Sequence, residues 1–184
     1  MSPAELRLLA EELARSAGTL AVQARRSIGN CAVPHTTKSS ATDPVTEFDK
    51  AAERVIVSEL RARRPDDSIV GEEGTGHAGS SPLAWHIDPI DGTVNFVYGL
   101  TPWATSIGVL DGDGGLAGAV YAPATDEMFS AARGEGATRN GVPISCSGVE
   151  DLAVALVATG FGYDRDRRAR QGAQVAALVP LVRD

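Results

Sequence analysis

Apolar residues recur every three or four positions along the first 28 residues of the chain. The segment opens with Ser2-Pro3-Ala4-Glu5, in which the serine oxygen can accept an N–H group, the proline suits a first turn and the glutamate can reach back. The apolar positions form one stripe: Leu6, Leu9, Leu13, Ala17, Leu20, Ala24 and Ile28. The pattern predicts a long helix that packs on another layer and ends at Gly29-Asn30.

A second stripe with helical spacing follows the polar loop PHTTKSSATDP. It starts near Thr46 and runs to RARRPDD, with apolar positions at Phe48, Ala51, Ala52, Val55, Ile56 and Leu60. This spacing predicts a second helix with Asp49 in its first turn. A third helix is predicted from about Arg165 to the end of the chain.

From residue 68 onward the pattern changes to short apolar runs separated by Gly, Pro and Asp turns. The runs are SIVG, AWHID, ATSIGVL, LAGAVYA and EMFSAA, and the clearest turn signals are DGDGG at 111–115 and RNG at 139–141. This pattern predicts a sheet with antiparallel hairpins. Helices followed by such a sheet indicate an α+β fold, in which the N-terminal helices pack on a largely antiparallel sheet.

Composition and charge exclude several classes of function. The 184 residues are 43% hydrophobic and 22% charged, which is typical of a globular protein. The net charge of −7 argues against nucleic acid as the main ligand, because phosphate backbones are bound by clustered Lys and Arg. The N-terminal segment carries carboxylates where a signal peptide needs an apolar run, and no window approaches the roughly 18 apolar residues of a membrane span. We therefore expect a cytoplasmic protein with no membrane association.

The chain has two cysteines, Cys31 and Cys146, and their spacing matches no metal or redox motif. We expect both to be buried free thiols.

The stretch WHIDPIDGTVNF, residues 85–96, carries the main candidate chemistry. A strand that ends at Asp88, a proline-fixed turn and Asp91 bring two carboxylates together, with the Ile90 carbonyl between them. Hard oxygen ligands of this kind are those that Mg²⁺ prefers. Another predicted strand ends in IVGEE, where Glu72 and Glu73 can turn a third carboxylate toward the same place. A cation among these groups would offset their mutual repulsion.

Directly after Asp91, Gly92-Thr93 is predicted to begin a helix, whose N–H groups and positive dipole end suit a phosphate. The same residues have a structural interpretation. Asp-Pro and Asp-Gly are common turn dipeptides, Thr is a good helix cap, and Glu-Glu at a strand end is often solvated. Asp49 can equally be a first-turn dipole partner, and Lys38 a solvated loop lysine. Spacing alone leaves both interpretations open.

Taken together, these segments resemble the inositol monophosphatase family of Mg²⁺-dependent, lithium-sensitive sugar phosphatases. Four blocks stand in the family's order: KSSATDPVTEFD (38–49), IVGEEG (69–74), WHIDPIDGTVNFVYGLTPWATSIGV (85–109) and RGEGATRNGVPI (133–144). The resemblance implies a layered α/β sandwich of the sugar-phosphatase type and a homodimer. It also implies an N-terminal α+β domain over residues 1–150 that carries the metal and phosphate site, and the start of a C-terminal α/β domain over residues 151–184.

Carried over by position, the resemblance implies a specific set of site residues. The metal ligands are Glu72, Asp88, Asp91 and the Ile90 carbonyl, which would hold two or three Mg²⁺ ions. The catalytic residues are Asp49, Thr93 and Glu72, of which Thr93 and Asp49 orient and deprotonate the attacking water. The substrate-binding residues are Gly92, Thr93 and Asp91, with the N–H groups of Gly92 and Thr93 against the phosphate. Glu73 is a supporting residue, and Lys38 lies in a loop outside the catalytic core.

The implied reaction is hydrolysis of a phosphate monoester of a small polyol by metal-activated water, without a covalent intermediate. Because DGTVNFVYGLTPWATSIGV is most similar to the inositol monophosphatase branch, we expect inositol 1-phosphate as substrate. Histidinol phosphate, or the substrate of another small phosphatase of the family, is the alternative. A non-catalytic interaction protein on the same fold is a further alternative, which the intact set of site residues disfavours.

Two features depart from the family pattern. His86 stands where the family tends to be aliphatic, and although strand alternation puts it on the face of Asp88, we expect a buried neutral histidine. The family also continues into an α/β half with a Trp-Asp motif, whose aspartate completes the second metal site. ATGFGYD at 158–164 resembles the entry to that half, so we expect either a fragment or part of a longer protein.

Overall fold

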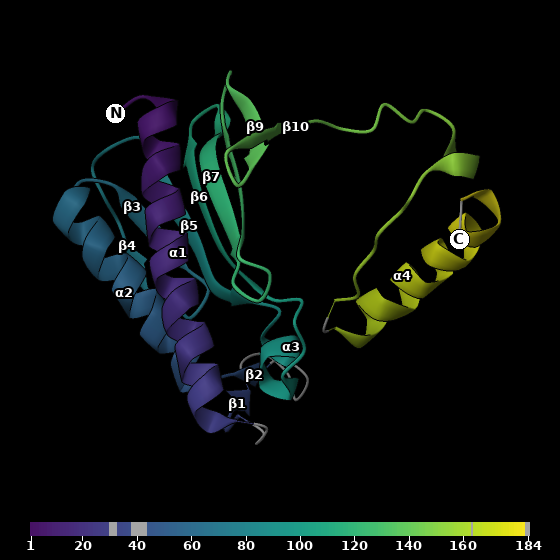
Figure 1. Ribbon diagram of the computed structural model, residues 1–184, viewed down its shortest axis with the longest axis horizontal. Coiled ribbons are helices and arrows are strands. Elements are labelled where there is room, and N and C mark those ends of the chain that lie inside the picture. Colours follow the sequence, from purple (N-terminus) through teal and green to yellow (C-terminus); the bar gives the residue numbers. More distant parts are fainter. Residues whose placement is uncertain (30–32, 38–43, 163, 183–184) are drawn as a thin grey trace. The chain divides into compact units, whose positions relative to one another are not determined.

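The computed structural model describes residues 1–29, 33–37, 44–162 and 164–182 (Figure 1). Contacts divide the chain into two units, the first built from Met1–Thr36 and Pro44–Ser145 and the second mainly from the residues after Ser145. The elements up to Ser145 are α1 (Pro3–Ile28), β1 (Thr36–Thr37), β2 (Pro44–Val45), α2 (Glu47–Arg63), β3 (Ser68–Gly71), β4 (Gly76–His77), β5 (Ala84–Asp91), α3 (Thr93–Tyr98), β6 (Ala104–Asp111), β7 (Gly114–Ala122), β8 (Glu127–Ala132), β9 (Gly136–Arg139) and β10 (Val142–Ile144), all of which belong to the first unit except Thr37. The second unit holds the short helix η1 (Leu152–Val154), α4 (Arg165–Leu178) and η2 (Val179–Leu181).

Helix α1 begins and ends where the sequence predicts. Its N-terminus is a capping box, in which the Glu5 N–H donates to the Ser2 hydroxyl (3.3 Å) and the Ser2 N–H donates to the Glu5 carboxylate (2.7 Å). Gly29, at φ 66°, caps the other end. The buried stripe follows the predicted one as far as Ala17 and then passes to Ala21, which leaves Leu20 on the exposed side.

Helix α2 is also confirmed, but its buried stripe differs from the predicted one. Thr46 is the N-cap and forms a second capping box with Asp49. The residues that face inward are Asp49, Ala52, Glu53, Ile56, Val57 and Leu60. Two carboxylates therefore lie on the face of α2 that packs into the protein.

The eight-stranded sheet has the order β10-β9-β8-β7-β6-β5-β3-β4 (Figure 1). Neighbouring strands run antiparallel, as predicted, except that β3 runs parallel to β5. The RNG signal forms the tight turn between β9 and β10, where Asn140 and Gly141 both have positive φ (51° and 77°). The parallel β3–β5 pair brings two strand ends to the same edge of the sheet.

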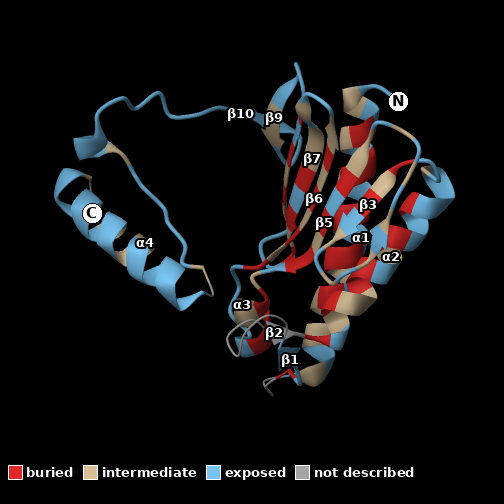
Figure 2. Cartoon of the chain, turned by 180° about the vertical axis from the view of Figure 1, so that it is seen from behind, coloured by how far each residue is buried: buried red, intermediate tan, exposed pale blue. Residues whose placement is uncertain are grey.

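Helices α1 and α2 cover one face of this sheet, and the core lies between them and the strands (Figure 2). Alternate side chains of β5 and β6 enter this core, among them Trp85, Ile87, Ile107 and Val109. A second buried cluster lies around α3, where Phe96 meets Trp103 edge-on with ring centroids 5.1 Å apart. This second cluster includes Ile90 and so supports the end of β5.

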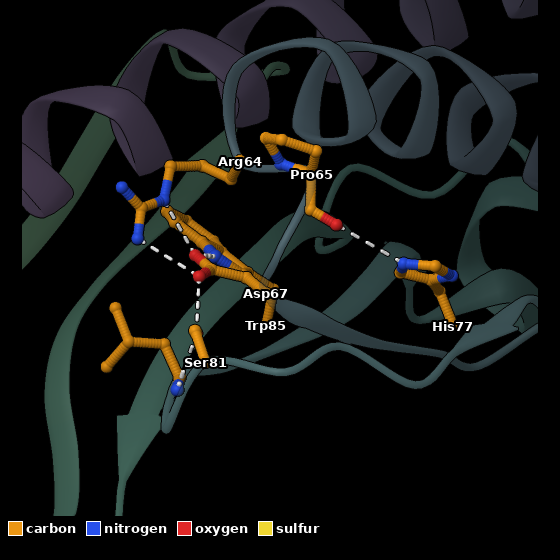
Figure 3. A network of polar contacts seen from close by, with 7 residues as sticks. Arg64, Pro65, Asp67, His77, Ser81 and Trp85 are labelled. Atoms are coloured by element: carbon orange, nitrogen blue, oxygen red, sulfur yellow. Dashed lines mark hydrogen bonds and ion pairs between the residues drawn. The ribbon is translucent and has the colours of Figure 1, made fainter.

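A buried polar network holds the start of β5 (Figure 3). The Asp67 side chain is 1% exposed in its ion pair with Arg64 (2.7 Å), and it also accepts hydrogen bonds from the Ser81 hydroxyl (2.6 Å) and the Trp85 indole N–H (2.8 Å). Burial raises the pKa of Asp67, but the hydrogen bonds from Arg64, Ser81 and Trp85 outweigh this and leave it below its ordinary value. Asp67 is therefore ionised and fully engaged by its neighbours.

In the second unit, the predicted third helix is confirmed as α4, which starts after the cap Asp164 and ends at Leu178. None of its residues is buried. The prediction of a buried thiol is wrong for Cys146, which is exposed because it lies in the extended segment after β10, and Cys31 lies outside the described residues. Among the described helices, none is long and apolar enough to cross a membrane.

Candidate active site

The end of β5 carries a β-bulge between the two predicted metal-binding aspartates. Asp88 pairs with Ser106 and Asp91 with Ala104, so three steps along β5 match two along β6. In a regular strand, residues three apart point to opposite faces of the sheet. The extra residue returns Asp91 to the face of Asp88, and both carboxylates can therefore serve one site.

A hydroxyl from the neighbouring strand supports this bulge. Thr105 of β6 is fully buried, and its Oγ1 donates to the Pro89 carbonyl at 2.9 Å. A bulge interrupts the ladder of backbone hydrogen bonds, so a buried carbonyl within it needs a donor from elsewhere. Thr105 supplies this donor and fixes the backbone next to Ile90.

The third predicted carboxylate, Glu72, stands directly beyond β3 and beside β5. Gly71 pairs with Ile87, and the Glu72 N–H donates to the Ile87 carbonyl (3.0 Å). A hollow of about 360 Å³ is lined by the exposed Glu72, the half-buried Asp88 and their neighbours Gly71, His86 and Ser106. The structure thus brings Glu72 and Asp88 to one hollow from two parallel strand ends.

His86 belongs to the same hollow, and the prediction that it is buried is wrong. The side chain is exposed because Trp85 and Ile87 take the inward positions under the helices, which leaves His86 on the opposite face with Asp88.

Asp91 lines a second hollow, of about 500 Å³, together with Gly92, Asn95 and Trp103. Gly92 adopts a left-handed conformation (φ 88°), and a Cβ added there would lie 3.1 Å from the Pro102 carbonyl oxygen. The chain turns at this glycine and enters α3 at Thr93, which confirms the predicted helix start.

Asp49 and Thr93, predicted to act together, are in contact and buried. Thr93 Oγ1 lies 3.3 Å from Asp49 Oδ1 and 3.0 Å from the Ile90 carbonyl oxygen. The other oxygen of Asp49 accepts from the N–H of Thr46 (2.7 Å) and from its hydroxyl. A hydroxyl has a single proton, so Thr93 can donate to Asp49 or to Ile90 but not to both. When it donates to Asp49, its oxygen can accept a hydrogen bond from a water molecule.

The donor set fits a hard divalent cation, because carboxylates and a backbone carbonyl are ligands that Mg²⁺ prefers. Across the residues that the structure describes, however, no three His, Cys, Asp or Glu side chains converge as they would around an ion. The assignment of Glu72, Asp88, Asp91 and the Ile90 carbonyl as metal ligands therefore stays a prediction. Lys38 lies outside the described residues.

Sequence reasoning did not single out Glu53 and Thr105, which both contact the backbone of the site. Glu53 accepts from the N–H groups of Glu73 and Thr75, next to Glu72. The sequence pattern nevertheless indicates that both side chains face inward. Glu53 stands four residues after Asp49 on the inner face of α2, and Thr105 alternates in phase with the buried residues of β6.

Comparison with known proteins places this arrangement in a family. A family model described as the inositol monophosphatase family matches residues 2–184. The inositol-1-monophosphatase SuhB of Mycobacterium tuberculosis is 43% identical over 199 residues, which cover 99% of this chain and 68% of that protein.

Solved structures agree in fold. The crystal structure of the extragenic suppressor protein SuhB from Bartonella henselae superposes with a TM-score of 0.87 at 28% identity, over 97% of this chain and 68% of the other. Mycobacterium tuberculosis SuhB superposes with a TM-score of 0.83 at 40% identity, over 100% of this chain and 68% of the other. These likenesses confirm the predicted α+β sandwich.

Proposed function

This chain belongs to the inositol monophosphatase family and is a phosphoric monoester hydrolase, and we propose that it hydrolyses inositol 1-phosphate with the help of Mg²⁺. The observation that carries the proposal is the buried Asp49–Thr93 pair beside the bulged end of β5. The pair offers a hydroxyl held by a carboxylate, and the strand end offers oxygen ligands on one face. Both halves of the site lie within residues 1–150.

In this proposal the side chains of Asp49 and Thr93 handle the nucleophile. Thr93 donates its proton to Asp49 and accepts from the attacking water, so the water is oriented toward the phosphorus. As the water oxygen bonds to phosphorus, its proton passes to Thr93 while the Thr93 proton passes to Asp49, which therefore serves as the base. The bond between phosphorus and the ester oxygen of the substrate breaks, and that oxygen takes up a proton from water and leaves as the alcohol. The backbone N–H groups of Gly92 and Thr93 bind the phosphate, and Asp91 borders the substrate.

Glu72, Asp88, Asp91 and the Ile90 carbonyl would hold the ions, two or three in number. When bound, Mg²⁺ supplies positive charge that offsets the phosphate oxygens and favours ionisation of water. The bulge serves this purpose by keeping Asp88 and Asp91 on one face. Thr105 serves it indirectly by holding the Pro89 carbonyl.

The test is release of inorganic phosphate from inositol 1-phosphate and from histidinol phosphate, each with and without Mg²⁺. We expect Mg²⁺-dependent turnover that is faster with inositol 1-phosphate, inhibition by Li⁺, and loss of turnover in Asp49→Asn. Faster turnover of histidinol phosphate would contradict the substrate assignment. A wild-type protein that binds Mg²⁺ but releases phosphate from neither ester would favour the non-catalytic alternative.

We also propose that the protein is a cytoplasmic homodimer, by analogy with the family. Sedimentation at micromolar concentration is expected to give twice the mass of one chain, and a single monomeric species would contradict the dimer.

A further inference from the structure

Helix α2 presents two buried carboxylates to two different parts of the candidate site. Asp49 and Glu53 are four residues apart, so they lie on the same side of the helix, and their exposed fractions are 0% and 1%. Asp49 contacts Thr93 of α3, whereas Glu53 contacts the turn that follows β3. Asp49 is the base in the proposed chemistry, whereas Glu53 has no role in it.

Both oxygens of Glu53 accept hydrogen bonds from that turn. Oε2 accepts from the Glu73 N–H at 2.9 Å, and Oε1 accepts from the Thr75 N–H at 3.2 Å. These two residues follow Glu72 closely, and the turn is closed by a hydrogen bond from the Gly71 N–H to the Thr75 carbonyl (2.8 Å). Glu53 therefore fixes the backbone on which Glu72 stands.

Gly71 makes room for this carboxylate. A Cβ added at residue 71 would overlap Glu53 Oε2, so a larger residue there would force the carboxylate or the turn to shift. Burying a carboxylate costs free energy even when its hydrogen bonds are satisfied. The buried Glu53 and the glycine at residue 71 together specify one arrangement of the turn. This turn lies at the edge of the hollow that Glu72 lines.

We propose that Glu53 is a positioning residue for Glu72. It holds the turn at residues 72–75 so that the Glu72 carboxylate stays at the hollow it shares with Asp88. The inference rests on the proposed function, in which Glu72 is a metal ligand. Because one helix carries both carboxylates, α2 fixes Thr93 and Glu72 relative to each other. Loss of Glu53 should therefore weaken cation binding more than it slows the chemical step.

The experiment compares Glu53→Gln with wild type in the full chain, and Glu59→Gln, an exposed substitution on the same helix, is the matched control. Glutamine keeps the size of the side chain but turns an amide donor toward one of the two backbone N–H groups.

Three quantities are measured: Mn²⁺ affinity from the electron paramagnetic resonance of free Mn²⁺, the Mg²⁺ concentration that gives half-maximal phosphate release, and the thermal unfolding midpoint. We expect Mn²⁺ affinity to fall about tenfold and the half-maximal Mg²⁺ concentration to rise by a similar factor. The kcat at saturating Mg²⁺ should change about twofold or less, and Glu59→Gln should match wild type.

A lower unfolding midpoint with unchanged Mn²⁺ affinity would overturn the proposal, because it would mean that Glu53 supports only the fold. If Glu53→Gln does not fold, Gly71→Ala tests the same contact from the other side. The added methyl group displaces the Glu53 carboxylate from the turn, but the side chain keeps its negative charge. Folded Gly71→Ala with wild-type Mn²⁺ affinity would likewise overturn the proposal. Failure of wild type to release phosphate would refute the proposed function alone, because the Mn²⁺ measurement needs no turnover.

Discussion

The two ends of strand β5 use aspartate in opposite ways. At its start, Asp67 is buried beside Trp85 and accepts hydrogen bonds from Arg64, Ser81 and the indole N–H (Figure 3). At its end, the half-buried Asp88 and the exposed Asp91 border hollows, and a bulge puts them on one face. The strand thus begins beside a buried hydrogen-bond network and ends in a bulge whose two carboxylates border hollows at the surface.

Stability and function are therefore expected to be separated along a single strand. Removing a carboxylate that is paired with a guanidinium inside the protein leaves a charge without its partner and destabilises the fold. Carboxylates at the edge of a hollow contribute less to the fold and can be reached by a ligand. Substitutions at the end of β5 should therefore affect turnover, and substitutions around its start should affect the free energy of unfolding.

The largest effect is expected for Asp88→Asn. This change removes the charge of a proposed metal ligand, and we expect phosphate release to fall about 1,000-fold, or ~4 kcal/mol in the activation barrier. The thermal unfolding midpoint should stay near that of wild type. Asp113→Asn, an exposed substitution in the β6–β7 turn, is the control. Wild-type turnover of Asp88→Asn at high Mg²⁺ would contradict a functional role for the end of β5.

Thr93→Ala should slow the chemical step and leave cation binding nearly intact. The hydroxyl orients water in this account, so we expect kcat to fall about 100-fold, while Mn²⁺ affinity stays within about twofold of wild type. Thr93→Ser keeps the hydroxyl and should retain most of the activity. An unchanged kcat in Thr93→Ala would remove Thr93 from the mechanism.

At the other end of the strand, Asp67→Asn should destabilise the protein without affecting turnover by folded molecules. We expect the free energy of unfolding to fall by about 2 kcal/mol, less than for a fully buried pair because the Arg64 side chain is 23% exposed. Urea denaturation measures this change, and phosphate release at 25 °C serves as the readout of function. Loss of activity without loss of stability would reverse the roles of the two ends.

The effect of Asp67→Asn on the free energy of unfolding should also depend on pH. The pKa of Asp67 in the folded protein is below its ordinary value of 3.8, so the folded state binds the proton less readily than the unfolded state. Asp67 therefore contributes to the free energy of unfolding above pH 3.8, the pKa in the unfolded chain. This contribution is lost as the pH falls from 3.8 through the lower pKa of the folded state. The difference between wild type and Asp67→Asn should shrink below about pH 4. A difference that stays constant from pH 7 to pH 3 would contradict the assigned role.

The smallest effect is expected for Thr105→Val, which keeps the shape of the side chain but removes the donor to the Pro89 carbonyl. We expect the free energy of unfolding to fall by about 1 kcal/mol, together with a several-fold loss in kcat/KM as the bulge loosens. Ser16→Ala, which removes an exposed hydroxyl on α1 that lines neither hollow, is the control. A loss of stability with unchanged kcat/KM would show that the bulge does not depend on Thr105.

Local signals in the sequence predict the helices and the antiparallel hairpins of the fold. The capping boxes at Ser2 and Thr46 and the RNG turn act over a few residues, so they can be read without knowledge of the tertiary structure. The parallel β3–β5 pair and the bulge cannot be read in this way. Both depend on the register between strands, which is set by packing across the whole sheet.

In the candidate site, too, some residues can be predicted from local motifs and others depend on tertiary packing. Resemblance to a family identified Asp49, Asp88 and Thr93 by their motifs, and the structure brings Asp49 and Thr93 into contact. The residues that support the motifs, such as Glu53 and Thr105, carry no motif of their own. The spacing of both residues indicates that they face inward, and the hydrogen bonds then show which backbone atoms they hold.

In the proposed function, the bulged end of β5 and the end of β3 bind divalent cations for phosphate ester hydrolysis. Anomalous scattering from Mn²⁺ in crystals of the full chain with inorganic phosphate would locate these ions. We expect Mn²⁺ within coordination distance of Glu72, Asp88, Asp91 and the Ile90 carbonyl, with phosphate against the start of α3. Mn²⁺ bound only at other residues, in a protein whose turnover requires the metal, would contradict this expectation.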